Sequence, residues 1–142
     1  ETPFEIGKAL VMRESDGAKT DVAIIACGPL VHNSLLAAEE LAKDGIECIV
    51  VNSHTIKPLD SETVVSVAKK AGAVVTVEEH QINGGLGSAV CEVLSEEYPV
   101  PVERVGVSDR FGESGEPNEL VEAFGMGVGS IVDAAAKVVD RK

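Results

Sequence analysis

The feature that most constrains the fold of this chain is a regular alternation, from Asp21 onward, of short apolar runs with stretches of helical periodicity. The apolar runs lie at residues 21–26, 46–51, 73–77 and 102–107, and we expect each to form a strand. The runs are largely apolar at consecutive rather than alternate positions, which is typical of parallel strands covered by helices on both faces. The pattern predicts one doubly wound α/β domain with right-handed crossovers.

Turn and capping signals place the remaining elements. We expect a first strand at Lys8–Arg13, followed by a turn at Ser15-Asp16-Gly17. Expected helices are the stripe from Val31 to Leu41, a helix capped by Asp60 and ended by Gly72, a stripe from Leu86 to Leu94, a helix from Pro117 to Phe124, and Val128–Val139. The polar, glycine-rich stretch SDRFGESGEPNEL, which starts at Ser108, predicts a long loop before the fourth helix.

Charge restricts the partners of the chain. Its 142 residues are enough for one compact domain, and they carry a formal net charge of -12. Nucleic-acid binding needs a cationic surface, and anionic membranes repel an acidic one, so we expect neither partner. Aromatic residues make up only 3% of the chain, which leaves the core to Val, Ile, Leu and Ala.

The apolar runs and the cysteines indicate the compartment. No apolar run approaches the length that spans a bilayer, and no basic and apolar leader opens the sequence. Cys27, Cys48 and Cys91 form no CxxC pair, and an odd number cannot be fully bridged within one chain. We therefore expect buried free thiols in a cytoplasmic protein.

Ligands of open α/β sheets bind beyond the carboxyl ends of the strands, so we expect any site at that edge. The residues placed there by the predicted strands are Gly28, Ser53, Glu78–His80 and Asn83–Gly87.

The glycine-rich turn Asn83-Gly84-Gly85-Leu86-Gly87 joins a predicted strand to a predicted helix. A helix start offers free N–H groups to an anion, and glycine permits close approach or positive φ. The turn lacks the GxGxxG spacing of dinucleotide sites and the Lys-Ser/Thr of a phosphate-binding loop. A tight structural turn and an anion or subunit contact both remain open. We expect positive φ at Gly85 and close packing at Gly87.

Glu78-Glu79-His80 could serve acid–base chemistry or bind a metal. No second histidine stands at ligand spacing, so a polar cluster held by hydrogen bonds or placed at a subunit contact is the simpler interpretation. Cys27, before Gly28-Pro29, lies where a thiol can be activated, but an inert packing role is the commoner one.

Four motifs in register resemble the C-terminal domain of transketolases. They are Thr55-Ile56-Lys57-Pro58-Leu59-Asp60, Thr76-Val77-Glu78-Glu79-His80, Gly84-Gly85-Leu86-Gly87-Ser88-Ala89-Val90 and Phe111-Gly112-Glu113-Ser114-Gly115. Similar domains occur in 1-deoxyxylulose-5-phosphate synthase and in the beta subunits of 2-oxoacid dehydrogenases. The lysine-proline-leucine turn together with Glu78-Glu79-His80 favours transketolase among them.

The resemblance implies a three-layer α/β/α domain at residues 8–142, with a five-stranded, mostly parallel sheet whose first strand is antiparallel; residues 1–7 would be a linker from a preceding domain. It implies a homodimeric transferase that moves a two-carbon ketol unit between sugar phosphates with thiamine diphosphate and Mg. The machinery for that reaction would lie in upstream domains of the same chain or of a separate subunit, so no catalytic, cofactor-binding or metal-binding residue is carried over. The candidate anion or subunit contacts are Gly28, Glu79, His80, Asn83, Gly84, Gly85 and Gly87.

Overall fold

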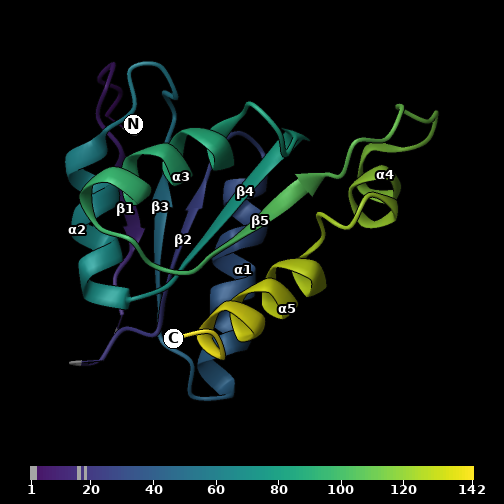
Figure 1. Ribbon diagram of the computed structural model, residues 1–142. Helices are drawn as coiled ribbons and strands as arrows, with labels where there is room; N and C mark the ends of the chain where they lie inside the picture. Colours follow the sequence, from purple (N-terminus) through teal and green to yellow (C-terminus); the bar gives the residue numbers. More distant parts are fainter. Residues whose placement is uncertain (1–2, 16, 18) are drawn as a thin grey trace.

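The computed structural model describes residues 3–15, 17 and 19–142 and has a five-stranded sheet at its centre (Figure 1). The strands are β1 (Leu10–Arg13), β2 (Val22–Ala26), β3 (Cys48–Asn52), β4 (Val74–Gln81) and β5 (Val102–Val107). Their order across the sheet is β1-β3-β2-β4-β5. β1 pairs with β3 in the antiparallel direction, whereas β2, β3, β4 and β5 pair in parallel. The mixed sheet expected from the resemblance is confirmed.

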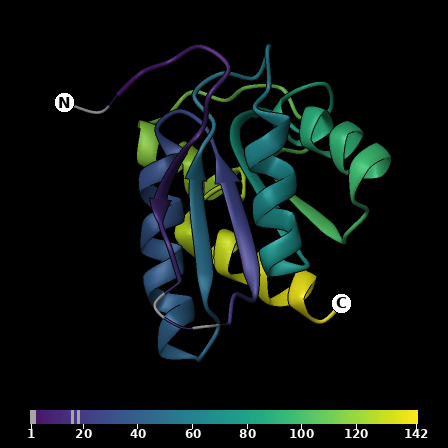
Figure 2. The ribbon, with the colours of Figure 1, turned by 90° about the vertical axis from the view of Figure 1, so that its left-hand side faces the viewer.

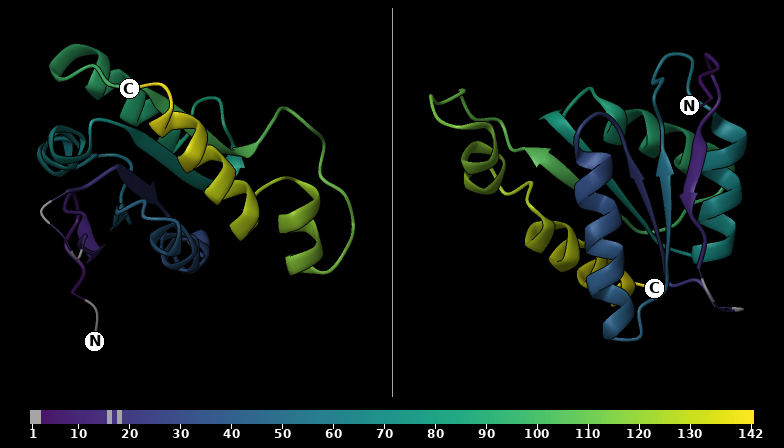
Figure 3. Two further views of the ribbon diagram at one scale, coloured as in Figure 1. Left: turned by 90° about the horizontal axis from the view of Figure 1, so that it is seen from below. Right: turned by 180° about the vertical axis from the view of Figure 1, so that it is seen from behind.

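Five helices connect and cover the strands. They are α1 (Leu30–Lys43), α2 (Ser61–Ala71), α3 (Leu86–Glu97), α4 (Pro117–Ala123) and α5 (Val128–Val139). In the views from the side and from below, α1 and α5 lie on one face of the sheet and α2 and α3 on the other (Figures 2 and 3). The result is the three-layer arrangement, with one apolar core on each side of the sheet.

Strand β2 is buried on both faces, which explains its uninterrupted apolar sequence. In β2, Ile24 belongs to the core beneath α1 and α5, whereas its neighbour Ile25 belongs to the core beneath α2 and α3. Both side chains are fully buried. Because successive side chains of a strand point to opposite faces, a strand between two helical layers needs an apolar residue at every position.

Local capping signals act as the sequence predicts. The side chain of Asp60 accepts a hydrogen bond from the N–H of Thr63 at the start of α2, and Gly72 ends that helix with a left-handed φ of 72°. Pro117 opens α4 at its first position. The turn expected at Ser15-Asp16-Gly17 includes Asp16, which lies outside the described residues.

Several strand boundaries differ from the prediction. β1 begins at Leu10 rather than Lys8, β3 covers Cys48–Asn52 rather than 46–51, and β2 and β4 each begin one residue later than expected. The largest difference is at β4, which continues to Gln81 rather than ending at Val77. The extension of β4 follows a shift in register, after which Gln81 pairs with Val107 of β5. The sequence did not predict this part of the strand because residues 78–81 are polar, and three of the four are exposed to solvent.

The segment between β5 and α5 projects from the rest of the domain (Figures 1 and 3). It consists of the loop at residues 108–116 and the short helix α4, which buries none of its own residues. Among the described residues, no helix has the length and apolar character needed to cross a membrane.

Candidate functional site

The polar residues predicted at the carboxyl edge of the sheet do lie at that edge. Gly28 follows β2, Ser53 follows β3, and Glu78 to His80 form the last part of β4. The N–H of Ser53 donates to the carbonyl oxygen of Ala26 at 2.8 Å, which ties the ends of β2 and β3 together. The turn at 82–85 leads from β4 into α3 at the same edge.

Glu78 points inward and holds the start of α3. Its side chain is buried, with 1% of the residue exposed. Its two carboxylate oxygens accept hydrogen bonds from the N–H groups of Leu86, at 3.0 Å, and Gly87, at 2.6 Å. The first turn of α3 contains no acid and has no side-chain cap from its own segment. A carboxylate from β4 therefore supplies both the hydrogen-bond acceptors and the negative charge that a helix start favours.

The glycines of the turn make this contact possible. A Cβ built on Gly85 would overlap the carboxylate of Glu78, and one on Gly87 would lie 2.8 Å from the hydroxyl oxygen of buried Thr76. The close packing expected at Gly87 is therefore present. The positive φ expected at Gly85 is wrong, because Gly85 has a φ of -102° and Gly84 carries the left-handed φ of 83°. Gly85 is needed for space rather than for its dihedral angle.

Glu79 and His80 turn away from Glu78 and are exposed. The three residues thus do not form one cluster, although their sequence suggested one. Asn83 and Gly84 are exposed as well, and Gly28, with a φ of 65°, has open space where a Cβ would be. The exposed candidates lie on the outer surface of the carboxyl edge, while Gly87 is buried beneath it and Gly85 is half-buried.

Sequence reasoning missed the role of Gln81. Its amide nitrogen donates to the carbonyl oxygen of Arg110 at 3.0 Å, and its amide oxygen accepts from the N–H of Asp109 at 2.9 Å. The end of β4 thereby holds the loop that follows β5. A polar residue at the end of a strand and a polar loop thirty residues later carry no local signal of this pairing.

The described residues do not fit a thiamine diphosphate or metal site. No group of three or more His, Cys, Asp or Glu side chains among them is arranged to hold a metal ion. At the start of α3, Glu78 already engages the N–H groups of Leu86 and Gly87 that would otherwise face a phosphate. A second anion there would meet the negative charge of the carboxylate.

The three cysteines are free, and two of them are less buried than the sequence suggested. Cys48 is buried, whereas Cys27 and Cys91 are half-buried. Burial, with a smaller contribution from the nearby carboxylate of Glu78, raises the pKa of the Cys27 thiol to about 11. A thiol with so high a pKa is almost entirely protonated at neutral pH, which makes Cys27 a packing residue rather than a nucleophile.

Together the sheet order and the two helical layers define a doubly wound α/β domain whose carboxyl edge is bonded internally through Ser53, Glu78 and Gln81. Residues 7–131 match the family model described as "Transketolase, C-terminal domain". The chain belongs to the transketolase C-terminal domain family, as the four motifs indicated, and transketolases as a family depend on thiamine diphosphate.

The similar proteins are transketolases and related transferases. The chain is 51% identical over 139 residues to the 6-deoxy-6-sulfo-D-fructose transketolase subunit SqwH of Clostridium sp. (strain MSTE9). The match covers 98% of this chain and 42% of that subunit. It is 44% identical over 125 residues to 1-deoxy-D-xylulose-5-phosphate synthase of Trichormus variabilis (strain ATCC 29413 / PCC 7937), covering 87% of the chain and 19% of that enzyme.

A solved structure described as "Split gene transketolase, inactive beta4 tetramer" superimposes with a TM-score of 0.92 at 46% identity. The match covers 98% of this chain and 44% of the solved chain. The chain thus spans less than half the length of these relatives.

Proposed function

We propose that this chain is the C-terminal structural and association domain of a thiamine-diphosphate-dependent transketolase that moves a two-carbon ketol unit between sugar phosphates. The observation that carries the proposal is the 51% identity, over nearly the whole chain, with a transketolase subunit. The chemistry resides in the domains that precede this one in the family, on the same polypeptide or on a companion subunit.

The bonding at the carboxyl edge supports a structural role. The anion-binding potential of the α3 N-terminus is used internally by Glu78, and the glycines make room for that carboxylate. The alternative, a small-anion or nucleotide-binding module at this edge, has no support from the comparisons, and the same contacts argue against it. In the whole enzyme, thiamine diphosphate and Mg bind outside this domain.

The partners of the domain are the N-terminal transketolase domains and, in a homodimer, a second subunit. Support comes from the solved relative, which is described as an "inactive beta4 tetramer". The exposed surface available for contacts at the carboxyl edge includes Gly28, Glu79, His80, Asn83 and Gly84, while Gly85 and Gly87 shape the turn beneath it. The three free cysteines support a cytoplasmic location.

The experiment is reconstitution. The complete enzyme, containing this domain and the polypeptide that carries the thiamine-binding domains, is assayed for ketol transfer between sugar phosphates with thiamine diphosphate and Mg. We expect turnover that depends on both parts and is lost when this domain is deleted. The proposal is contradicted if the enzyme containing the domain transfers no ketol unit, or if deletion of the domain leaves both the rate and the assembly unchanged.

A further inference from the structure

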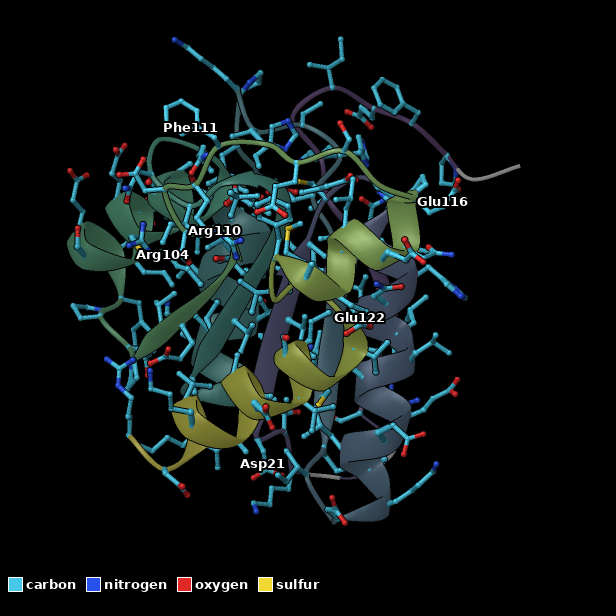
Figure 4. All side chains as sticks on the ribbon, turned by 90° about the vertical axis from the view of Figure 1, so that its right-hand side faces the viewer. Asp21, Arg104, Arg110, Phe111, Glu116 and Glu122 are labelled. Atoms are coloured by element: carbon cyan, nitrogen blue, oxygen red, sulfur yellow. The ribbon has the colours of Figure 1, made fainter. Side chains whose placement is uncertain are left out.

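The most exposed large apolar side chain in the described part of the chain is Phe111, in the loop between β5 and α4. Its exposed fraction is 97%, compared with 70% for Ile6 and 68% for Phe4. Figure 4 shows Phe111 standing at the carboxyl edge of the sheet, above Arg110 and Arg104. Removing an aromatic side chain from water is favourable, so the full exposure of Phe111 on this domain leaves that stabilisation to a partner.

The backbone just before Phe111 is held in place. Gln81 makes hydrogen bonds to Asp109 and Arg110 on its amino-terminal side. The guanidinium of Arg110 lies 4.7 Å from the ring centre of Phe124 and 2.9 Å from a carboxylate oxygen of Glu113. An aromatic side chain on a braced loop loses little freedom when it binds, which is the property of an anchor residue at an interface.

The segment that carries Phe111 is rich in acidic side chains. Residues 108–123 contain five acids, Asp109, Glu113, Glu116, Glu119 and Glu122, and all five are exposed. Arg110 is the one basic residue of this segment, and it is engaged by Glu113 and Phe124. Two copies of this surface facing each other would bring like charges together, which disfavours a second copy as the occupant. The fitting partner has an apolar pocket with a cationic rim.

The position of the loop indicates where that partner lies. The chain enters β1 at the same edge of the sheet, because Leu10 pairs with Asn52 at the carboxyl end of β3. Just before it, the N–H of Gly7 donates to the hydroxyl of Thr55 at 2.9 Å, which holds the entering segment against that edge. The domains that precede a transketolase C-terminal domain therefore reach this domain at its carboxyl edge, at the β1 end, and Phe111 stands at the β5 end of the same edge.

We propose that Phe111 is the anchor by which this domain docks onto the thiamine-diphosphate-binding part of the transketolase, where it enters an apolar pocket rimmed by Lys or Arg. The inference rests on the proposed function, since that function supplies the partner. The acids of the loop and of α4 pair with the rim, and Gln81 and Arg110 hold the loop in the docking position.

Photo-cross-linking in the complete enzyme tests the contact. We would place p-benzoylphenylalanine at position 111 and, as a control, at Leu36, an apolar residue on α1 that is 37% exposed. We expect the probe at 111, and not the probe at 36, to cross-link to a peptide of the thiamine-diphosphate-binding part. A cross-link to a second copy of this domain, or a yield at 111 no higher than at 36, overturns the proposal.

A substitution tests the energetic role. Phe111→Ala should weaken assembly with the thiamine-diphosphate-binding part at least about tenfold, as expected for an anchor residue. The isolated Phe111→Ala domain should melt like the parent, because the side chain is 97% exposed. Assembly as tight as that of the parent contradicts the proposal. Both experiments measure contact rather than turnover, so their failure is distinguishable from an absence of ketol transfer.

Discussion

The carboxylate of Glu78 lies where the Cβ atom of a non-glycine residue at position 85 would be. The same carboxylate accepts hydrogen bonds from the N–H groups of Leu86 and Gly87. An acid at the end of β4 and glycines at the start of α3 therefore form one unit. The glycine-rich turn allows the start of α3 to bind a buried carboxylate. It resembles a phosphate-binding loop because in both cases N–H groups at a helix start bind an anion, which here is the side chain of Glu78.

Alanine substitutions at the glycines test this packing directly. We expect Gly85→Ala and Gly87→Ala each to lower the free energy of unfolding by about 2 kcal/mol, because neither Glu78 nor Thr76 can move aside freely. The matched control is Gly129→Ala in the first turn of α5, where a Cβ meets nothing within 4 Å. That variant should equal the parent or gain up to about 1 kcal/mol. Urea unfolding gives the free energy of unfolding of each variant. Equal values for the three variants would refute close packing at Gly85 and Gly87.

Removing the charge of Glu78 should weaken the start of α3. Glu78→Gln should cost about 1–3 kcal/mol, because a neutral amide offers one acceptor oxygen where the carboxylate offers two. Its exposed neighbour is the control, and Glu79→Gln should stay within about 0.5 kcal/mol of the parent. Equal unfolding free energies for the two variants would show that Glu78 is dispensable.

The clash at Gly85 should depend on Glu78. In an E78A background, Gly85→Ala meets no carboxylate, so we expect its cost to fall by at least about 1 kcal/mol relative to the same change in the parent. Urea unfolding of the four members of this double-mutant cycle gives the coupling. Strict additivity would mean that another neighbour, and not Glu78, restricts position 85.

Asp60 should give the domain a measurable pH dependence. Burial acts to raise the pKa of Asp60. Hydrogen bonds from the N–H of Ala9 and from the N–H and hydroxyl of Thr63 outweigh that effect, so the pKa lies below the ordinary 3.8. A lowered pKa means that the ionised group stabilises the folded state above about pH 4 and that this stability is lost as the pH falls through the folded pKa.

The measurement is the difference in unfolding free energy between the parent and Asp60→Asn. We expect about 1–3 kcal/mol in favour of the parent at pH 7, where the carboxylate is ionised, and a shrinking difference below pH 4. A difference that is the same at pH 7 and pH 3 would rule out this role for the charge of Asp60.

The thiol of Cys27 should be unreactive in the folded domain. Its pKa rises from 9.0 to about 11 through burial and the charge of Glu78. The thiolate fraction at pH 8 therefore falls about a hundredfold relative to the unfolded chain, and alkylation by iodoacetamide should slow by at least that factor. Mass spectrometry of the Cys27 peptide gives both rates. Comparable rates in native and urea-unfolded protein would mean that the thiol is activated after all.

Local signals in the sequence predicted the architecture well. The consecutive apolar residues of β2 could only belong to a strand buried on both faces, and Asp60 and Gly72 marked the ends of α2 through contacts within a few residues. The antiparallel first strand came from the family resemblance, since Leu10–Arg13 alone carries no sign of direction.

The candidate site was harder to predict because its contacts join distant positions. Glu78 looked like a partner of Glu79 and His80, yet it bonds to the start of α3, eight and nine residues away. The available signal was a helix start with glycine at the cap position and no acid in its first turn, preceded by an acid in a buried strand. The contacts of Gln81 with Asp109 and Arg110 depend on the pairing of β4 with β5, which no local pattern reveals.

We propose that ketol transfer in the whole enzyme takes place outside this domain, and the most direct test of that proposal is an assay of the chain alone. The purified chain is incubated with thiamine diphosphate, Mg and pentose phosphates, and ketol transfer is measured before and after a second purification. We expect no turnover above background, because no group of His, Cys, Asp or Glu side chains among the described residues is arranged to hold a metal ion and the N–H groups at the start of α3 are engaged by Glu78. Turnover that persists through the second purification would contradict it.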